Sequence, residues 1–358
     1  MSARLAGAGR AAESRSVLTW RGEMFTVLLA AWTISGAFLD GWVHSKLGRP
    51  ETFFTPWHGV FYSGFAALSF WIVWSMIGNL KKGREGRAAI PVGYDLGLLG
   101  LLVFLVGVLG DFLWHIGFGI EQAGERLASP AHLLLFVGGL LAVTSPLRAA
   151  WAQRDDAPSL RTFLPGLLSL TLTTTVVAFM LWHLWGFDSV QWLGVRQYQQ
   201  FQQQFTGSAD AIQQLLFLAQ ARVAGAILVT NFVLLAPALL MLRRWRVPFG
   251  SVTILFTLTT VWMAALREFW VWETIVVALW SGLAADVLVR TTQPSPGRIS
   301  AFRLFAATVP LALWALYFVI THLRWGLVAA PELWVGGVFF TAVTGLALSL
   351  IMVPAREA

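Results

Sequence analysis

The sequence predicts an all-α protein, a polytopic integral membrane bundle of about ten transmembrane helices arranged as outward-pointing hairpins. Of its 358 residues, 57% are hydrophobic and 12% are charged. That leaves too little polar surface to cover a water-soluble protein of this size. Apolar stretches of roughly 20 residues, the length that crosses a bilayer, also recur along the whole chain. The composition therefore predicts the lipid bilayer as a partner.

Ten stretches are apolar and long enough to be transmembrane helices: 23–44, 58–79, 94–117, 131–149, 163–187, 219–242, 249–267, 272–289, 304–322 and 333–353. We expect a single transmembrane domain, 1–358, made of hairpin 1 at 23–79, hairpin 2 at 94–149 and the remaining hairpins at 163–353. An extracytoplasmic polar loop is expected at 188–218. Its glutamine-rich and aromatic stretch, Gln199 to Phe205, predicts a short surface helix outside the bilayer.

The basic residues indicate the orientation of the helices. They cluster before the first stretch, after every second stretch and at the end of the chain, at Arg4, Arg10, Arg15, Arg21, Lys81, Lys82, Arg84, Arg87, Arg148, Arg154, Arg161, Arg243, Arg244, Arg246, Arg290, Arg298, Arg303 and Arg356. Cytoplasmic loops carry an excess of such residues. Both termini are therefore predicted in the cytoplasm, and we expect a bacterial plasma membrane. The same pattern explains the net charge of +7, so no nucleic-acid partner is expected.

The chain contains no cysteine. This excludes disulfide bonds, iron–sulfur clusters, thiolate zinc sites and covalently attached c-type haem. Any bound metal must be held by histidine nitrogen and by carboxylate or carbonyl oxygen.

All six histidines are predicted at the outward ends of the helices. Four of them end an outgoing helix and two open a returning one, and they are His44, His115, His183 and His322, then His58 and His132. Ionisable groups at membrane depth are energetically costly, and they usually face the interior of a bundle or a wet cavity. The shared level of the histidines therefore indicates an extracytoplasmic site.

Hairpin 1 carries the pattern that predicts this site in most detail. Its residues are, in order, Asp40, His44, Glu51, Thr55, Pro56 and His58. Asp40 and His44 are four residues apart and lie on one helix face. Thr55 suits an N-cap and Pro56 the first helical position, which puts His58 in the first turn of the returning helix. The hairpin then brings an aspartate and two histidines together as metal ligands, with positions left open for water or substrate.

Hairpin 2 repeats these elements in the same order, as Asp111, His115, Glu121, Ser129, Pro130 and His132. An isolated aspartate–histidine pair could equally be a structural hydrogen bond or a proton relay. The repetition favours a site, although duplication of a hairpin would also produce it. His183 and His322 stand in weaker versions of the pattern, and we expect them to support a site or the structure rather than bind metal.

The string Gly110-Asp111-x-x-x-His115, followed by Glu121 and Pro130-x-His132, resembles the C subunit of the copper membrane monooxygenases, the particulate methane and ammonia monooxygenase family. The resemblance covers two hairpins, about a third of the chain. It implies copper ligands at Asp111, His115 and His132, with Asp40, His44 and His58 as the equivalent set. Glu51 and Glu121 would act as bases or additional ligands. This chain has more helices than that subunit, and its spacing from His115 to His132 is wider.

The leading hypothesis is a copper-binding membrane protein. A more specific version of it is an oxidoreductase that acts on a small apolar substrate. Such an activity needs a redox partner, and the resemblance implies other membrane subunits as further partners. The alternatives are a metal or proton relay or transporter, a zinc-dependent membrane hydrolase with Glu51 or Glu121 as base, and bis-histidine haem. Zinc and iron suit the same ligands. Few ionisable residues lie in the inward halves of the helices, which argues against a complete channel. Asp286 is the main candidate there and has no obvious partner in the sequence.

Overall fold

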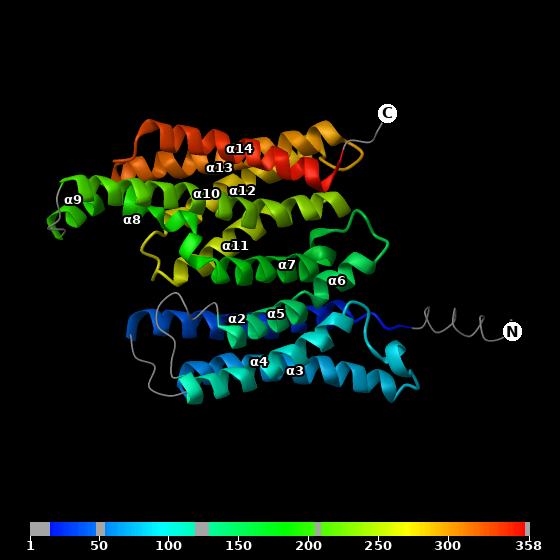
Figure 1. Ribbon diagram of the computed structural model, residues 1–358. Coiled ribbons are helices and arrows are strands. Elements are labelled where there is room, and N and C mark those ends of the chain that lie inside the picture. Colours follow the sequence, from blue (N-terminus) through cyan, green and yellow to red (C-terminus); the bar gives the residue numbers. More distant parts are fainter. Residues whose placement is uncertain (1–14, 48–53, 119–128, 205–208, 355–358) are drawn as a thin grey trace. The chain divides into compact units, whose positions relative to one another are not determined.

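The structure, a computed structural model, describes residues 15–47, 54–118, 129–204 and 209–354 (Figure 1). Every regular element in these ranges is a helix. Nine helical segments there are long and apolar enough to cross a membrane, with α5 and α6 counted together, and the apolar helix α11 is shorter. The predicted all-α membrane bundle of about ten helices is therefore confirmed.

The longer helices are α2 (Trp20–Leu47), α3 (Pro56–Leu80), α4 (Asp95–Phe118), α5 (Pro130–Val143), α6 (Ser145–Ala152), α7 (Leu160–Met180), α9 (Val195–Gln204), α10 (Ala209–Arg244), α11 (Ser251–Ala265), α12 (Glu273–Thr292), α13 (Ile299–Trp325) and α14 (Pro331–Met352). The short ones are η1 (Gly86–Ala89), η3 (Trp182–Leu184), η4 (Gly186–Ser189) and α8 (Val190–Leu193). The contacts divide the chain into two compact units. Unit 1 is Met1–Arg154 with Arg161–Val176, and unit 2 is Asp155–Leu160 with Val177–Ala358.

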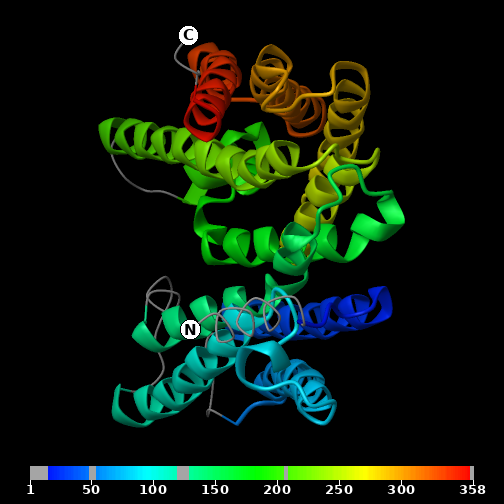
Figure 2. The same ribbon diagram turned by 90° about the vertical axis from the view of Figure 1, so that its right-hand side faces the viewer.

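Unit 1 contains the two predicted motif hairpins as packed helix pairs, α2 with α3 and α4 with α5, which lie side by side in both views (Figures 1 and 2). Glycines allow the close approach of the helices. A Cβ atom at Gly36 would lie 2.4 Å from the Cα atom of Phe61, and one at Gly138 would lie 2.5 Å from the backbone nitrogen of Phe104. No larger residue fits these positions without moving the neighbouring backbone.

Unit 2 contains two further packed pairs, α11 with α12 and α13 with α14, and α10 packs against α14. Its core includes Phe187, Trp314 and Tyr317, all buried. Asp286 has clear partners here. Its carboxylate accepts hydrogen bonds from the backbone N–H groups of Val252 and Thr253 at 3.1 and 3.0 Å, and from the Thr253 hydroxyl at 2.6 Å. It therefore caps the start of α11, as an acidic group at a helix N-terminus should.

Three segments change or add detail to what the sequence predicted. α7 ends at Met180 and the chain continues in the short turns η3 and η4, so the fifth helix is shorter than 163–187. The polar loop 188–218 contains α8, α9 and the start of α10, and α9 agrees with the predicted short helix. The seventh and eighth helices separate in a turn where Glu268 and Phe269 have positive φ angles of 54° and 58°.

Candidate metal centre

The two sides of the hairpin 1 site are set by different local features. Asp40 and His44 come one turn apart on α2, and His58 comes from the first turn of α3. Thr55 is the N-cap of α3, and its hydroxyl accepts a hydrogen bond from the backbone N–H of His58 at 3.3 Å. Pro56 follows at the first helical position. The predicted cap is therefore present, and it fixes the backbone from which His58 projects.

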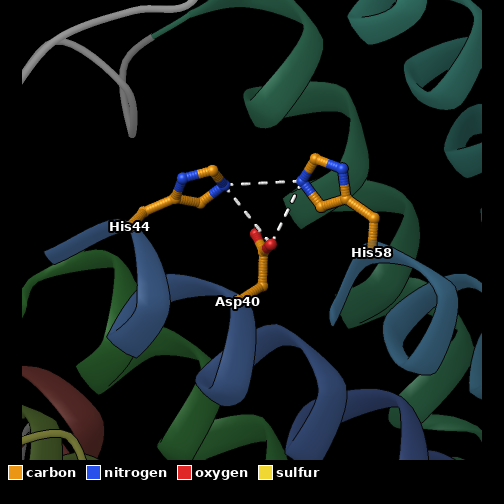
Figure 3. Close-up of side chains that lie close together, drawn as sticks. All are labelled: Asp40, His44 and His58. Carbon is orange, nitrogen blue, oxygen red and sulfur yellow. Dashed lines mark hydrogen bonds and ion pairs between the residues drawn. The ribbon is translucent and has the colours of Figure 1, made fainter. Parts of the chain in front are cut away.

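Asp40, His44 and His58 point toward one another (Figure 3). The Oδ1 atom of Asp40 lies 3.3 Å from Nε2 of His44 and 3.1 Å from Nε2 of His58. The two Nε2 atoms are 3.5 Å apart. The described residues thus contain a group of three N/O ligand atoms that all face one point.

This cluster is largely removed from solvent. The exposed fraction of the side chain is 8% for His58, 14% for His44 and 18% for Asp40. Oδ1 of Asp40 is itself buried, and no donor among the described residues makes an aligned hydrogen bond to it. A buried carboxylate oxygen is costly unless something positive satisfies it. The nearest polar atoms to Oδ1 are Nε2 of His44 and Nε2 of His58, so a proton on one of these rings or a cation between the three residues would satisfy it.

The spacing of the three atoms fits a metal ion. Ligand atoms at 2.0–2.2 Å from a tetrahedral ion are about 3.3–3.6 Å apart, and histidine nitrogen and carboxylate oxygen bind at these lengths. The observed separations of 3.1–3.5 Å need only small side-chain movements to match this. Three protein ligands leave at least one coordination position open, which is the pattern of catalytic rather than structural metal sites.

Hairpin 2 brings its residues together around Asp111, whose side chain is almost fully buried. Oδ1 of Asp111 lies 3.4 Å from Nδ1 of His115 and 3.5 Å from Nε2 of His132. Nδ1 of His115 is also 2.7 Å from the backbone carbonyl oxygen of Asp111. Nδ1 at that distance donates its proton to the carbonyl, so only Nε2 of His115 keeps a lone pair for a metal. Metal binding by this second set therefore stays a prediction.

His132 is also held through Nδ1, but by a side chain instead of a backbone carbonyl. Ser129 is the N-cap of α5, and its Oγ lies 2.7 Å from Nδ1 of His132. This contact occupies Nδ1 and leaves Nε2 facing Asp111. A histidine that is fixed through one ring nitrogen and presents the other is the usual arrangement beside metals and in relays.

Tyr62 connects the two hairpins, and sequence reasoning missed it. Its hydroxyl donates a hydrogen bond to Oδ2 of Asp111 at 3.0 Å. Its ring lies one helical turn after His58, with ring centroids 5.8 Å apart. The four-residue spacing from His58 was the available signal, but the contact with Asp111 depends on the register between α3 and α4.

A buried polar network near the start of α2 was also missed. The Tyr94 hydroxyl donates to Oε2 of Glu23 at 2.7 Å, and Thr26 Oγ1 lies 3.0 Å from the Tyr94 oxygen. The indole N–H of Trp71 donates to Thr26 Oγ1 at 2.9 Å. Glu23 precedes Asp40 by 17 positions on α2, about 25 Å along the helix, so this network is separate from the metal cluster.

The remaining predicted residues fall elsewhere. Glu51 and Glu121 lie outside the described residues. His183 lies in η3, where partial burial and the Arg222 guanidinium lower its pKa, and His322 is exposed near the end of α13. Both belong to unit 2, whereas the six motif residues belong to unit 1.

Comparisons with protein-family models, with curated proteins and with solved structures found no match to this chain.

Proposed function

We propose that this integral membrane protein binds copper at Asp40, His44 and His58. The observation that supports it is the convergence of one carboxylate oxygen and two imidazole nitrogens within 4.8 Å of one another. Copper is the ion we choose because a given set of nitrogen and oxygen ligands binds Cu²⁺ more tightly than the other divalent first-row metals.

The finer proposal is an oxidoreductase of the monooxygenase type. A metal with an open position in an apolar bundle could meet dioxygen and a small apolar substrate, both of which dissolve in the bilayer. Insertion of one oxygen atom into a C–H bond reduces the other atom to water, with two electrons and two protons from a redox partner. Copper supplies the redox chemistry, while Asp40, His44 and His58 hold it and the surrounding helices exclude water.

Metal analysis of the purified protein tests the copper proposal. We expect close to one copper per chain at the hairpin 1 site, with an EPR signal in the air-oxidised protein. His58→Ala and His44→Ala should each remove that signal, because two remaining ligands bind far more weakly. His322→Ala is the matched control, since it removes an exposed histidine from unit 2 and should leave the signal unchanged.

The other outcomes separate the alternative functions. Stoichiometric zinc that depends on His58 would replace the copper proposal by a zinc site that activates water, as in a hydrolase. A protein that binds neither metal in its folded form would leave Asp40, His44 and His58 as a proton relay or a structural cluster. If copper is bound, oxygen consumption with short apolar substrates and a chemical reductant then tests the oxidoreductase.

A further inference from the structure

Both oxygens of the Asp111 carboxylate have polar neighbours, and Tyr62 is the neighbour of one of them. Oδ2 accepts the phenol hydrogen of Tyr62, and Oδ1 faces His115 and His132. Asp111 is 1% exposed. A buried carboxylate depends strongly on each donor, so loss of the phenol hydrogen should shift the position of Asp111.

Tyr62 also borders the metal cluster. It follows His58 by one turn on α3, and the two rings are tilted by 49° at a centroid distance of 5.8 Å. The Tyr62 ring therefore limits the directions in which the His58 ring can turn. His58 reaches Asp40 from this position. A series of neighbouring side chains thus leads from Asp40 through His58 and Tyr62 to Asp111.

Aromatic packing between α3 and α4 fixes the position of Tyr62 relative to Asp111. Phe65 and Phe104 stack with centroids 3.5 Å apart, and Phe61 contacts Phe104 edge-on at 5.6 Å. Closer to the site, Phe54 and Phe112 lie 6.2 Å apart. Phe61 also contacts the Tyr62 ring, with centroids 5.1 Å apart, and this packing restricts the rotation of Tyr62 away from Asp111.

We propose that Tyr62 is a positioning residue that couples the metal site of hairpin 1 to the Asp111–His132 cluster of hairpin 2. This inference depends on the proposed metal binding at Asp40, His44 and His58. Tyr62 does not bind the metal. Its hydrogen bond to Asp111 fixes its ring, and its ring fixes His58. The two hairpins consequently form one functional unit rather than two independent sites.

The coupling has a measurable size. Removal of a residue that orients a metal ligand typically weakens metal binding by about 10–100-fold. Tyr62→Phe removes the donor of this hydrogen bond and Asp111→Ala removes its acceptor, so each should weaken copper binding at the hairpin 1 site. If they act through that one interaction, the double variant should lose no more than the worse single variant.

The experiment is a double-mutant cycle on copper affinity in the full-length protein. Copper is titrated into the wild type, Tyr62→Phe, Asp111→Ala and the double variant, and the readout is the EPR signal that His58→Ala abolishes. Tyr94→Phe is the matched control, because it also removes a buried phenol from unit 1 but at the Glu23 network. We expect about a tenfold or greater loss of affinity for Tyr62→Phe, with altered copper hyperfine splitting, and neither change for Tyr94→Phe.

Two results would overturn the inference while leaving copper binding intact. One is a Tyr62→Phe protein whose affinity and spectrum match those of Tyr94→Phe. The other is a double variant whose fold loss of copper affinity equals the product of the two single-variant losses. That result would mean that Tyr62 and Asp111 act independently on the metal site. A wild-type protein without copper would instead refute the proposed function, so the two failures are distinguishable.

Discussion

At the scale of single residues, the sequence predicted the members of the hairpin 1 cluster but not their neighbours. Asp40 and His44 share a face because of their four-residue spacing, and Thr55 places His58 in a first turn. These are local rules. The contact of Tyr62 with Asp111 depends on how α3 packs against α4, and no spacing within one helix encodes it.

The partners of Asp286 and Glu23 illustrate the same limit. Asp286 looked isolated in the sequence, yet it caps the start of α11, 33 and 34 positions away along the chain. Nothing in the sequence indicated a role for Glu23, yet it is 6% exposed and accepts a hydrogen bond from Tyr94. Long-range partners decide whether a lone carboxylate in a membrane helix is structural.

The Tyr94–Glu23 hydrogen bond gives a prediction for stability. Tyr94→Phe leaves Oε2 of Glu23 without the donor 2.7 Å away, and a buried polar group that loses its partner costs about 1–3 kcal/mol. The midpoint of thermal unfolding in detergent, followed by tryptophan fluorescence, should fall. Tyr198→Phe serves as control, because Tyr198 only accepts an exposed bond from Gln202, and its midpoint should hardly move. Equal midpoints for wild type and Tyr94→Phe would contradict the prediction.

Asp188 gives a prediction for pH dependence. Burial raises its pKa to about 6, although Arg267, 3.6 Å away, acts in the opposite direction. The pKa of Asp188 in the folded protein exceeds its value of about 3.9 in the unfolded chain. Between about pH 4 and pH 6, Asp188 therefore holds a proton in the folded state that it lacks in the unfolded state. Its contribution to the free energy of unfolding is complete below about pH 4 and is lost as the pH rises through about 6.

Measurements of the free energy of unfolding of the wild type and of Asp188→Asn test the direction of this pH dependence. Relative to Asp188→Asn, the wild type should lose about 1 kcal/mol between pH 5 and pH 7.5. The asparagine keeps a hydrogen-bonding side chain next to Arg267 but cannot titrate. Parallel stability curves for the two proteins would show that Asp188 has an ordinary pKa.

At the scale of elements, helix ends determine the site more than helix interiors do. The sequence predicted the starts of α3 and α5 well, because each has a hydroxyl N-cap followed by proline. It extended the fifth helix too far, because the residues from Leu181 to Phe187 are as apolar as the helix before them. The structure turns there into η3 and η4, and Gly186 hydrogen-bonds the Thr230 side chain of α10. Apolar composition alone does not reveal such a tertiary contact.

The N-cap of α3 therefore gives a prediction that combines stability and metal binding. Thr55→Ala removes the acceptor for the backbone N–H of His58, at a cost of about 1 kcal/mol. The first turn of α3 then frays, and copper affinity should fall. Thr55→Ser retains the hydroxyl and should restore both quantities. A Thr55→Ala protein that binds copper as tightly as the wild type would mean that packing alone holds His58.

At the scale of the whole molecule, the membrane character follows from composition and from nine apolar helices among the described residues. The hairpins follow from short polar segments between long apolar ones, since close sequence neighbours pack most easily. The division into two compact units had no such signal. Its boundary crosses α7, inside a continuous apolar helix, so only tertiary contacts reveal it.

The orientation of the chain in the membrane gives the last prediction, and the absence of cysteine makes it simple to test. Each introduced cysteine is the sole thiol, so a membrane-impermeant maleimide reports its side of the membrane. The basic loops predict that Glu85→Cys and Asp155→Cys, both at exposed positions, react only after intact cells are permeabilised. Gln199→Cys and Glu332→Cys, also at exposed positions, should react in intact cells. Glu23 lies in the first turn of α2, at the predicted cytoplasmic end, and the metal cluster lies about 25 Å farther along this helix. The cluster would then lie on the extracytoplasmic side. Labelling of Glu85→Cys in intact cells would reverse that orientation and place the cluster at the cytoplasmic surface.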